Sequence, residues 1–159
     1  MIKSQLDFDW MNGEIVLVRK LQRADLNRVA EIWLDTNINA HNFIAAQYWQ
    51  NHFKAVKQMF LQAEVYVYED ENKNRIEGFI GLMDDHIAGI FVWKEAQSRG
   101  IGKHLLDCAK SIKKQLNLSV YQRNIRAVKF YQREDFKIQS EDIDADTGEK
   151  EYFMVWKRL

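Results

Sequence analysis

Residues 90–106 run Ile90-Phe-Val-Trp-Lys-Glu-Ala-Gln97-Ser-Arg-Gly100-Ile-Gly102-Lys-His-Leu-Leu106, and this stretch decides the fold. Its apolar start predicts the end of a strand over His86–Trp93, buried on both faces because the apolar run is continuous. A polar loop over Lys94–Gly100 then leads into a helix predicted over Ile101–Gln115. The start of a helix has unpaired amides and a partial positive charge.

The glycines of this loop allow an anion to approach the helix start closely, because they lack a side chain and tolerate positive φ. Arg99 and Lys103 add positive charge beside them. This chemistry suits a phosphate or pyrophosphate better than a bare carboxylate. Two common phosphate motifs do not fit. The Walker A pattern lacks its hydroxyl, because His104 follows Lys103, and the dinucleotide pattern fails at Leu105.

The periodicity of the remaining chain predicts a mixed sheet. The predicted strands are Glu14–Lys20, Glu64–Glu69, Arg75–Met83, His86–Trp93, Leu116–Tyr121, Phe136–Ser140 and Glu151–Trp156. The predicted helices begin at Arg23–Asp25 and cover Leu26–Leu34, Ala45–Ala63, Ile101–Gln115 and Asn124–Arg133. We predict loops over the polar Asp35–His41 segment and the acidic Asp142–Gly148 segment. The order indicates an α/β (α+β) fold with a mixed, mostly antiparallel sheet of about seven strands and about four helices.

Composition limits the class of protein. The chain has 159 residues, 47% apolar and 13% aromatic, which predicts one ordered domain over residues 1–159. One cysteine, Cys108, excludes an internal disulfide framework, and the four histidines show no metal-ligand spacing, so we expect no metal site. The start of the chain is unlike a signal peptide, and no apolar run approaches the ~20 residues of a membrane span. We therefore expect a cytoplasmic protein without membrane contact.

The formal net charge is zero, but the charges are unevenly distributed. Residues 94–137 hold 11 basic and 4 acidic side chains, whereas residues 1–93 sum to −4 and residues 138–159 to −3. A basic segment in a neutral protein is what a local anion site requires, and a solvated lysine-rich helix face is the alternative. Because the chain as a whole is not basic and this segment has no aromatic platform, nucleic-acid binding ranks low.

The spacing of Gln97, Gly100 and Gly102 on a strand–loop–helix unit resembles the acetyl-CoA signature of the GNAT N-acetyltransferase superfamily. Lys94 stands where that family often has a proline. This departure indicates a less rigid loop without removing an amide donor.

A second string, residues 124–136, is similar to the family's Asn-x-x-Ala-x-x-Phe-Tyr-x-x-x-Gly-Phe. The matching residues are Asn124, Ala127, Phe130, Tyr131 and Phe136. Asp135 replaces the family's glycine at the end of a helix, where the left-handed αL conformation is wanted, and we expect a local cost in stability without loss of the site.

The resemblance implies a fold, a cosubstrate and site residues. The cosubstrate would be acetyl-CoA, and Tyr131 would be the catalytic residue that returns a proton to the departing thiolate. Packing of Tyr131 against Phe130 is the alternative, and Asn124 is an N-cap as well as a candidate coenzyme contact. The implied cofactor-binding residues are Phe91, Val92, Gln97, Ser98, Arg99, Gly100, Ile101, Gly102, Lys103, Asn124, Ala127 and Tyr131.

The acceptor would be a primary amine of a small molecule, peptide or protein, and it must lose a proton before direct attack. The residues leave the general base open among Glu31, His41, Asp84, Asp85 and His86. Candidate acceptor residues are Trp33, His41, Tyr48 and Asp84, although the aromatic ones also fit a core. The rival interpretation is a non-catalytic coenzyme A sensor or partner-regulating domain of the same fold. Assembly as a homodimer is left open.

Overall fold

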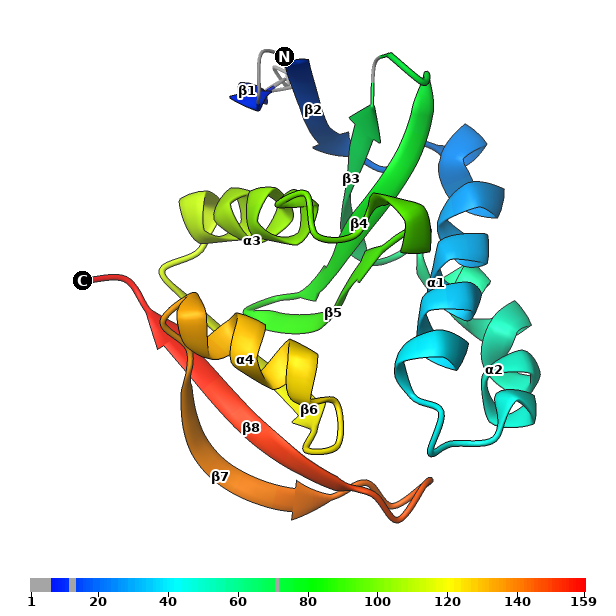
Figure 1. Cartoon of the computed structure of the whole chain (residues 1–159), viewed down its shortest axis with the longest axis vertical. Coiled ribbons are helices and arrows are strands. Elements are labelled where there is room, and N and C mark those ends of the chain that lie inside the picture. Colours follow the sequence, from blue (N-terminus) through cyan, green and yellow to red (C-terminus); the bar gives the residue numbers. More distant parts are fainter. Residues whose placement is uncertain (1–6, 12–13, 71) are drawn as a thin grey trace.

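The computed structural model describes residues 7–11, 14–70 and 72–159, which form one mixed eight-stranded sheet with helices on both faces (Figure 1). The strand order is β1-β2-β3-β4-β5-β6-β8-β7. The strands are β1 Asp7–Met11, β2 Glu14–Lys20, β3 Glu64–Asp70, β4 Arg75–Met83, β5 His86–Val92, β6 Gln115–Tyr121, β7 Lys137–Ile143 and β8 Lys150–Lys157. The α-helices are α1 Leu26–Ala40, α2 Ala46–Met59, α3 Ile101–Ile112 and α4 Ile125–Arg133.

The predicted fold class is confirmed, and the sheet has one strand more than the prediction. The additional strand, β1, pairs antiparallel with β2. Two predicted helices end early, because α2 stops at Met59 and α3 at Ile112, and Gln115 already opens β6. None of the helices among the described residues is long and apolar enough to cross a membrane.

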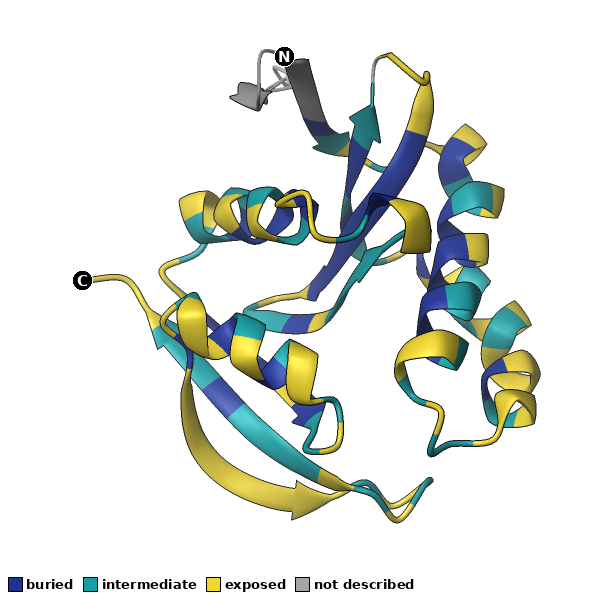
Figure 2. Cartoon of the chain, viewed as in Figure 1, coloured by how far each residue is buried: buried dark blue, intermediate teal, exposed yellow. Residues whose placement is uncertain are grey.

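Strand β4 is the centre of the core, and its residues from Ile76 to Leu82 are all buried (Figure 2). Its neighbours Phe79 and Ile80 point to opposite faces, because successive side chains alternate along a strand. Phe79 belongs to a cluster covered by α1 and α2, and Ile80 to a cluster covered by α3 and α4. The two-sided burial predicted for β5 is therefore found on β4.

Helix α1 is longer than predicted. The segment Asp35–His41 was expected to be a loop because it is polar, but α1 continues to Ala40. The Thr36 hydroxyl donates to the carbonyl of Ile32 at 2.6 Å, and the side-chain amide of Asn37 donates to the carbonyl of Trp33 at 2.9 Å. These polar side chains are satisfied within the helix, so burying them does not break it.

Strands β5 and β6 run parallel and part soon after they meet. Among the described residues their register holds one pair, His86 with Asn117. Three hydrogen bonds secure this end. The backbone amide of Asn117 donates to the backbone carbonyl of Asp85 at 2.9 Å, and the Gln115 side chain donates to the Asp85 carboxylate at 2.9 Å. The His86 ring forms a hydrogen bond with the side-chain oxygen of Asn117 at 2.7 Å. Beyond this seam the strands diverge, and the gap between them positions the site (Figure 1).

Candidate active site

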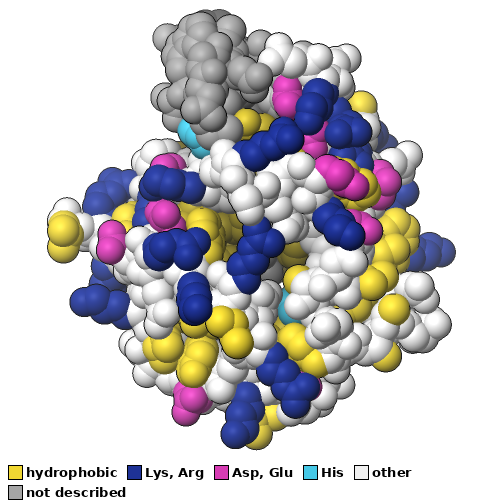
Figure 3. Space-filling view, viewed as in Figure 1, with side chains coloured by type: hydrophobic (Ala, Val, Ile, Leu, Met, Phe, Trp, Pro, Cys, Tyr) yellow, Lys and Arg dark blue, Asp and Glu magenta, His cyan; other side chains and the backbone are white. Residues whose placement is uncertain are grey.

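A cavity of about 1050 Å³ lies where β5 and β6 part, and the hollow is bordered by basic side chains (Figure 3). Its wall comes from the end of β5, the loop before α3 with the first turn of α3, one side of α4 along its length and the last turns of α1. Eleven of the twelve predicted cofactor-binding residues line it: Phe91, Val92, Gln97, Ser98, Gly100, Ile101, Gly102, Lys103, Asn124, Ala127 and Tyr131. The half-buried state of β5 beyond Gly89 follows from its position at this wall.

The start of α3 has the geometry of an anion cradle. Gly100 is the N-cap, with φ 82° and ψ 9°, a left-handed conformation that suits glycine. The first intrahelical amide bond runs from His104 to Gly100 at 3.1 Å, so the amides of the preceding turn have no partner in the helix. Gly102 lies inside this first turn, and an added Cβ there would touch the Phe130 ring at 3.5 Å. The absence of a side chain therefore keeps this end of α3 open towards α4.

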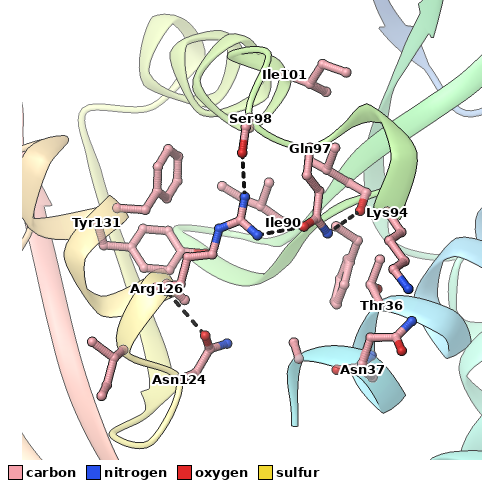
Figure 4. Close-up of a pocket in the computed structure, with 18 of the residues that line it drawn as sticks. Thr36, Asn37, Ile90, Lys94, Gln97, Ser98, Ile101, Asn124, Arg126 and Tyr131 are labelled. Atoms are coloured by element: carbon pink, nitrogen blue, oxygen red, sulfur yellow. Dashed lines mark hydrogen bonds between the residues drawn. The ribbon is translucent and has the colours of Figure 1, made fainter.

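One of the cations that line the cavity is a residue that the sequence prediction missed. Arg126 of α4 reaches across the cavity and donates to the Gln97 side-chain oxygen at 2.7 Å and to the Ser98 hydroxyl at 3.0 Å (Figure 4). The Gln97 side-chain amide in turn donates to the Val92 carbonyl at 3.0 Å. Only the helical placement of residue 126 beside the Asn124 motif could have indicated this role.

The two cations that were expected at the cradle are arranged differently. Arg99 is exposed and lies outside the cavity lining. Lys103 lines the cavity, but its ammonium pairs with Glu134 at 3.2 Å and with Asp107 at 3.4 Å. The hydrogen bond to Glu134 raises the pKa of Lys103. The charge of Lys103 is thus largely compensated within the protein.

Tyr131 lies in the cavity wall and is only 7% exposed. Its ring packs edge-on against Phe130 and Phe136, with centroids 5.2 and 5.5 Å away. Burial raises the pKa of the Tyr131 phenol, so the hydroxyl is protonated at neutral pH. The turn that ends α4 has the predicted geometry, because Asp135 has a φ of 68° and the Phe136 amide donates to the Tyr131 carbonyl at 3.0 Å.

Asn124 and His41 connect the two walls of the cavity. The Asn124 oxygen caps α4 by accepting from the Ala127 amide at 3.2 Å, which leaves its amide nitrogen 3.2 Å from His41 Nε2. His41 stacks on Trp49 at 5.4 Å and meets the Tyr121 ring edge-on at 5.1 Å. Burial lowers the pKa of His41 to about 4. His41 is therefore neutral, and its Nε2 accepts a hydrogen bond from Asn124.

The other acceptor candidates do not line the cavity. Trp33 is 8% exposed and packs edge-on against Trp49 in the core, with centroids 5.8 Å apart. Tyr48 is half-buried outside the lining, and burial together with the nearby Asp144 charge raises its pKa. Asp84 is exposed in the β4–β5 turn with a φ of 53°. Their side chains serve the core or the surface instead of the cavity.

The candidate bases are likewise dispersed. Glu31 is exposed and pairs with Arg28 at 3.2 Å. Asp85 and His86 form the seam between β5 and β6 and do not line the cavity. His41 lines it but is too weakly basic to deprotonate an ammonium group of pKa about 10.

Comparison with known proteins identifies the family to which the chain belongs. Residues 62–138 match the family model of the acetyltransferase (GNAT) domain. Peptidyl-lysine N-acetyltransferase YiaC of Escherichia coli strain K12 is 33% identical over 142 residues, which cover 88% of this chain and 96% of that protein. The chain belongs to the GNAT acetyltransferases. It is an acetyl-CoA-dependent enzyme that transfers an acetyl group to a primary amine.

Other similar proteins include a further peptidyl-lysine N-acetyltransferase and two solved structures that share the fold. Peptidyl-lysine N-acetyltransferase YjaB of the same strain is 24% identical over 134 residues, which cover 84% of this chain and 90% of that protein. The solution structure of apo YjaB from Escherichia coli has a TM-score of 0.79 at 21% identity, with 91% of this chain and 99% of that chain covered. The PaiA N-acetyltransferase of Thermoplasma acidophilum, solved with coenzyme A, has a TM-score of 0.74 at 18% identity, with 89% and 98% covered.

The residues of this GNAT enzyme fit a pyrophosphate-bearing cosubstrate. The left-handed Gly100, the unpaired first-turn amides of α3 and the guanidinium of Arg126 converge on one side of the cavity. Helix α1 forms another part of the wall and contributes Asp35, Thr36 and Asn37. The sequence prediction named His41 from this segment, but it treated residues 35–41 as a loop and did not name Asp35, Thr36 or Asn37. The cavity wall thus combines a cationic cradle with the polar end of α1.

Proposed function

We propose that the acetyl acceptor of this GNAT enzyme is the ε-amine of a lysine side chain in a peptide or protein. The observation that carries the proposal is a carboxylate, Asp35, on the part of the cavity wall that α1 forms. The cavity lining holds two carboxylates among the described residues, Asp35 and Glu134. Glu134 pairs with Lys103 at 3.2 Å. Asp35 belongs to α1 and lines the cavity without an ion pair to Lys103 or Arg123, which pair with Glu134 and Glu149 among the described residues. A carboxylate there favours an incoming ammonium group.

Two further observations support a lysine substrate. The relatives YiaC and YjaB are peptidyl-lysine N-acetyltransferases. The acidic turn between β7 and β8 is linked to the cavity-lining His41, because the Tyr121 hydroxyl donates to Asp144 at 2.6 Å and the Tyr121 ring contacts His41. A negative surface close to the cavity attracts basic peptides and raises their rate of encounter.

The roles of the site residues follow from their chemistry. Acetyl-CoA supplies the acetyl group and a thiolate leaving group. The first-turn amides of α3 hold its phosphates, and the backbone of Phe91 and Val92 offers hydrogen bonds to its amide-bearing arm. Asp35 binds the acceptor ammonium, which gives up a proton to water. The neutral amine then forms the new C–N bond as the C–S bond breaks, and Tyr131 donates its proton to the departing sulfur. The proton that the new amide nitrogen loses passes through water to the Tyr131 oxygen, which restores the phenol.

A panel of acceptors tests the proposed substrate class. The enzyme is incubated with acetyl-CoA and an N-terminally acetylated peptide that has one lysine, with the same peptide carrying norleucine, or with spermidine, and products are identified by mass spectrometry. We expect acetylation of the lysine peptide, at the side chain, with kcat/KM at least 10-fold above that for spermidine. Acetylation of spermidine but not of the lysine peptide would contradict the proposal.

Substitution of Asp35 tests whether this carboxylate binds the acceptor. Asp35→Asn removes the charge and keeps the shape, so we expect KM for the lysine peptide to rise about 5-fold to 10-fold, as a charged hydrogen bond of roughly 1–1.5 kcal/mol would give. KM for acetyl-CoA should not change. Glu31→Gln is the matched control, since Glu31 is an exposed carboxylate of the same helix outside the cavity. An equal effect of both substitutions would refute a specific role for Asp35.

We also propose that residues 1–159 form a single domain, that the protein is cytoplasmic and that it can assemble as a homodimer. Light scattering of the purified chain tests the last of these. The rival hypothesis of a coenzyme A sensor predicts binding of acetyl-CoA without turnover of any amine in the panel.

A further inference from the structure

The guanidinium of Arg126 bridges the coenzyme cradle from the opposite side of the cavity. Arg126 belongs to the first turn of α4, whereas its two partners, Gln97 and Ser98, lie in the loop before α3. Figure 4 shows the guanidinium between these partners, in the middle of the cavity. Because the Gln97 amide also holds the Val92 carbonyl, one chain of hydrogen bonds links α4, the loop and the end of β5.

The Arg126 guanidinium has no carboxylate partner at this position among the described residues. Both of its partners are neutral oxygens. Two other cations of the lining, Lys103 and Arg123, do pair with carboxylates, at 3.2 Å with Glu134 and at 3.4 Å with Glu149. An uncompensated guanidinium next to unpaired helix amides is a site for an anion.

The geometry of the two bonds matches a phosphate group. Both terminal nitrogens of Arg126 point at the loop, in the fork that binds two oxygens of one phosphate. The bonds to Gln97 and Ser98 are bonds to neutral acceptors, so exchanging them for charged oxygens strengthens each one.

We propose that Arg126 is a ligand of the coenzyme A pyrophosphate, and that in the absence of coenzyme it closes the cradle by bonding Gln97 and Ser98. The motif around Gly100 and Gly102 assigns the pyrophosphate to backbone amides of the loop, so this assignment adds a side chain from a separate helix. When the phosphates enter, Arg126 leaves its loop partners and closes over them. The inference concerns the coenzyme alone and does not depend on the identity of the acceptor.

Binding measurements with three ligands test this assignment. Isothermal titration calorimetry is run without acceptor, using coenzyme A, dephospho-coenzyme A and pantetheine, on the unchanged enzyme and on Arg126→Gln. We expect Kd to rise about 10-fold for both phosphate-containing ligands, which is the loss of a charged hydrogen bond. Pantetheine, which lacks the pyrophosphate, should bind within 2-fold of the unchanged enzyme.

Two further variants separate the phosphate contact from other effects. Arg126→Lys keeps the charge without the fork, so its Kd for coenzyme A should lie between those of the unchanged enzyme and Arg126→Gln. Lys129→Gln removes the same charge from an exposed position of α4 outside the cavity, and should leave Kd unchanged within 2-fold. Thermal unfolding of every variant shows whether the fold is intact.

Each other outcome overturns the assignment. A loss with coenzyme A that disappears with dephospho-coenzyme A would move Arg126 to the 3′-phosphate. An equal loss with pantetheine would make Arg126 a structural residue of the cradle. An unchanged Kd for all three ligands in Arg126→Gln, or the same loss in Lys129→Gln, would remove Arg126 from the pyrophosphate. Since no acceptor is present, failure of lysine acetylation does not alter these readings.

Discussion

Acidification should weaken the fold through one residue, His41. In the folded protein burial among aromatic rings lowers the pKa of His41 to about 4, whereas an unfolded histidine titrates near 6.5. Between these values the unfolded chain binds a proton that the folded chain does not bind. Stability therefore falls as the pH drops from about 6.5 to about 4, and it is fully retained above pH 7.

The size of the effect follows from the two pKa values. At pH 5 the unfolded histidine is almost fully protonated and the folded one is about nine-tenths neutral. The difference lowers the free energy of unfolding by about 2 kcal/mol relative to pH 7.5, or by roughly 4–8 °C in Tm for a chain of this size. Urea unfolding followed by tryptophan fluorescence, at pH 7.5 and at pH 5, measures this change.

The contribution of His41 is isolated by His41→Gln, whose side chain can still accept a hydrogen bond from Asn124. We expect the difference in unfolding free energy between the two pH values to shrink by about 2 kcal/mol in this variant. His52→Gln replaces an exposed histidine of α2 and should keep the full difference. If His41→Gln lost as much stability on acidification as the unchanged protein, the buried neutral His41 would not be the cause.

Three other substitutions have defined outcomes. Tyr131→Phe should lower kcat by about 100-fold with KM for acetyl-CoA unchanged within 2-fold, as measured by release of the coenzyme thiol; a kcat within 3-fold would mean that another group protonates the sulfur. Gly102→Ala should raise the free energy of unfolding by up to about 1 kcal/mol, because its new methyl group makes an ordinary contact with Phe130 at 3.5 Å inside a helix, and a decrease in urea unfolding would contradict this. Gly78→Ala should lower that free energy by about 1–3 kcal/mol, because the methyl group would lie 2.9 Å from the Phe91 carbonyl oxygen of β5, and an unchanged stability would show that β5 can move away.

The sequence predicted the sheet and the cradle best where local chemistry decides the structure. The change from period 2 to helical periodicity placed β5, the loop and α3, and the glycine spacing placed the anion cradle at the start of α3. The αL turn at Asp135 followed from the same local reasoning, since a helix end needs that conformation whichever residue occupies it.

The prediction failed where distant residues decide the structure. Residues 35–40 are polar, but Thr36 and Asn37 bond back into their own helix and α1 packs on the sheet, so tertiary contacts extend it. Arg126 gains its role from partners 28 and 29 residues away, which no local pattern reveals. Trp33 and Tyr48 were plausible acceptor contacts by type, yet Trp33 lies in the core and Tyr48 outside the cavity lining.

The short pairing between β5 and β6 has a consequence for local unfolding of the molecule. The half built from β6, β8, β7 and α4 is joined to the rest of the sheet by one register pair, His86 with Asn117, although side chains such as Leu118 and Met154 share the core. Amide hydrogens of β6 and β8 should therefore exchange through a local opening of lower free energy than those of β3 and β4. A ligand that contacts both sides of the gap joins the two halves a second time. At a concentration 100-fold above Kd it raises the free energy of unfolding by about 2.7 kcal/mol. Slower amide exchange in β6 and β8 would then report the occupancy of the gap.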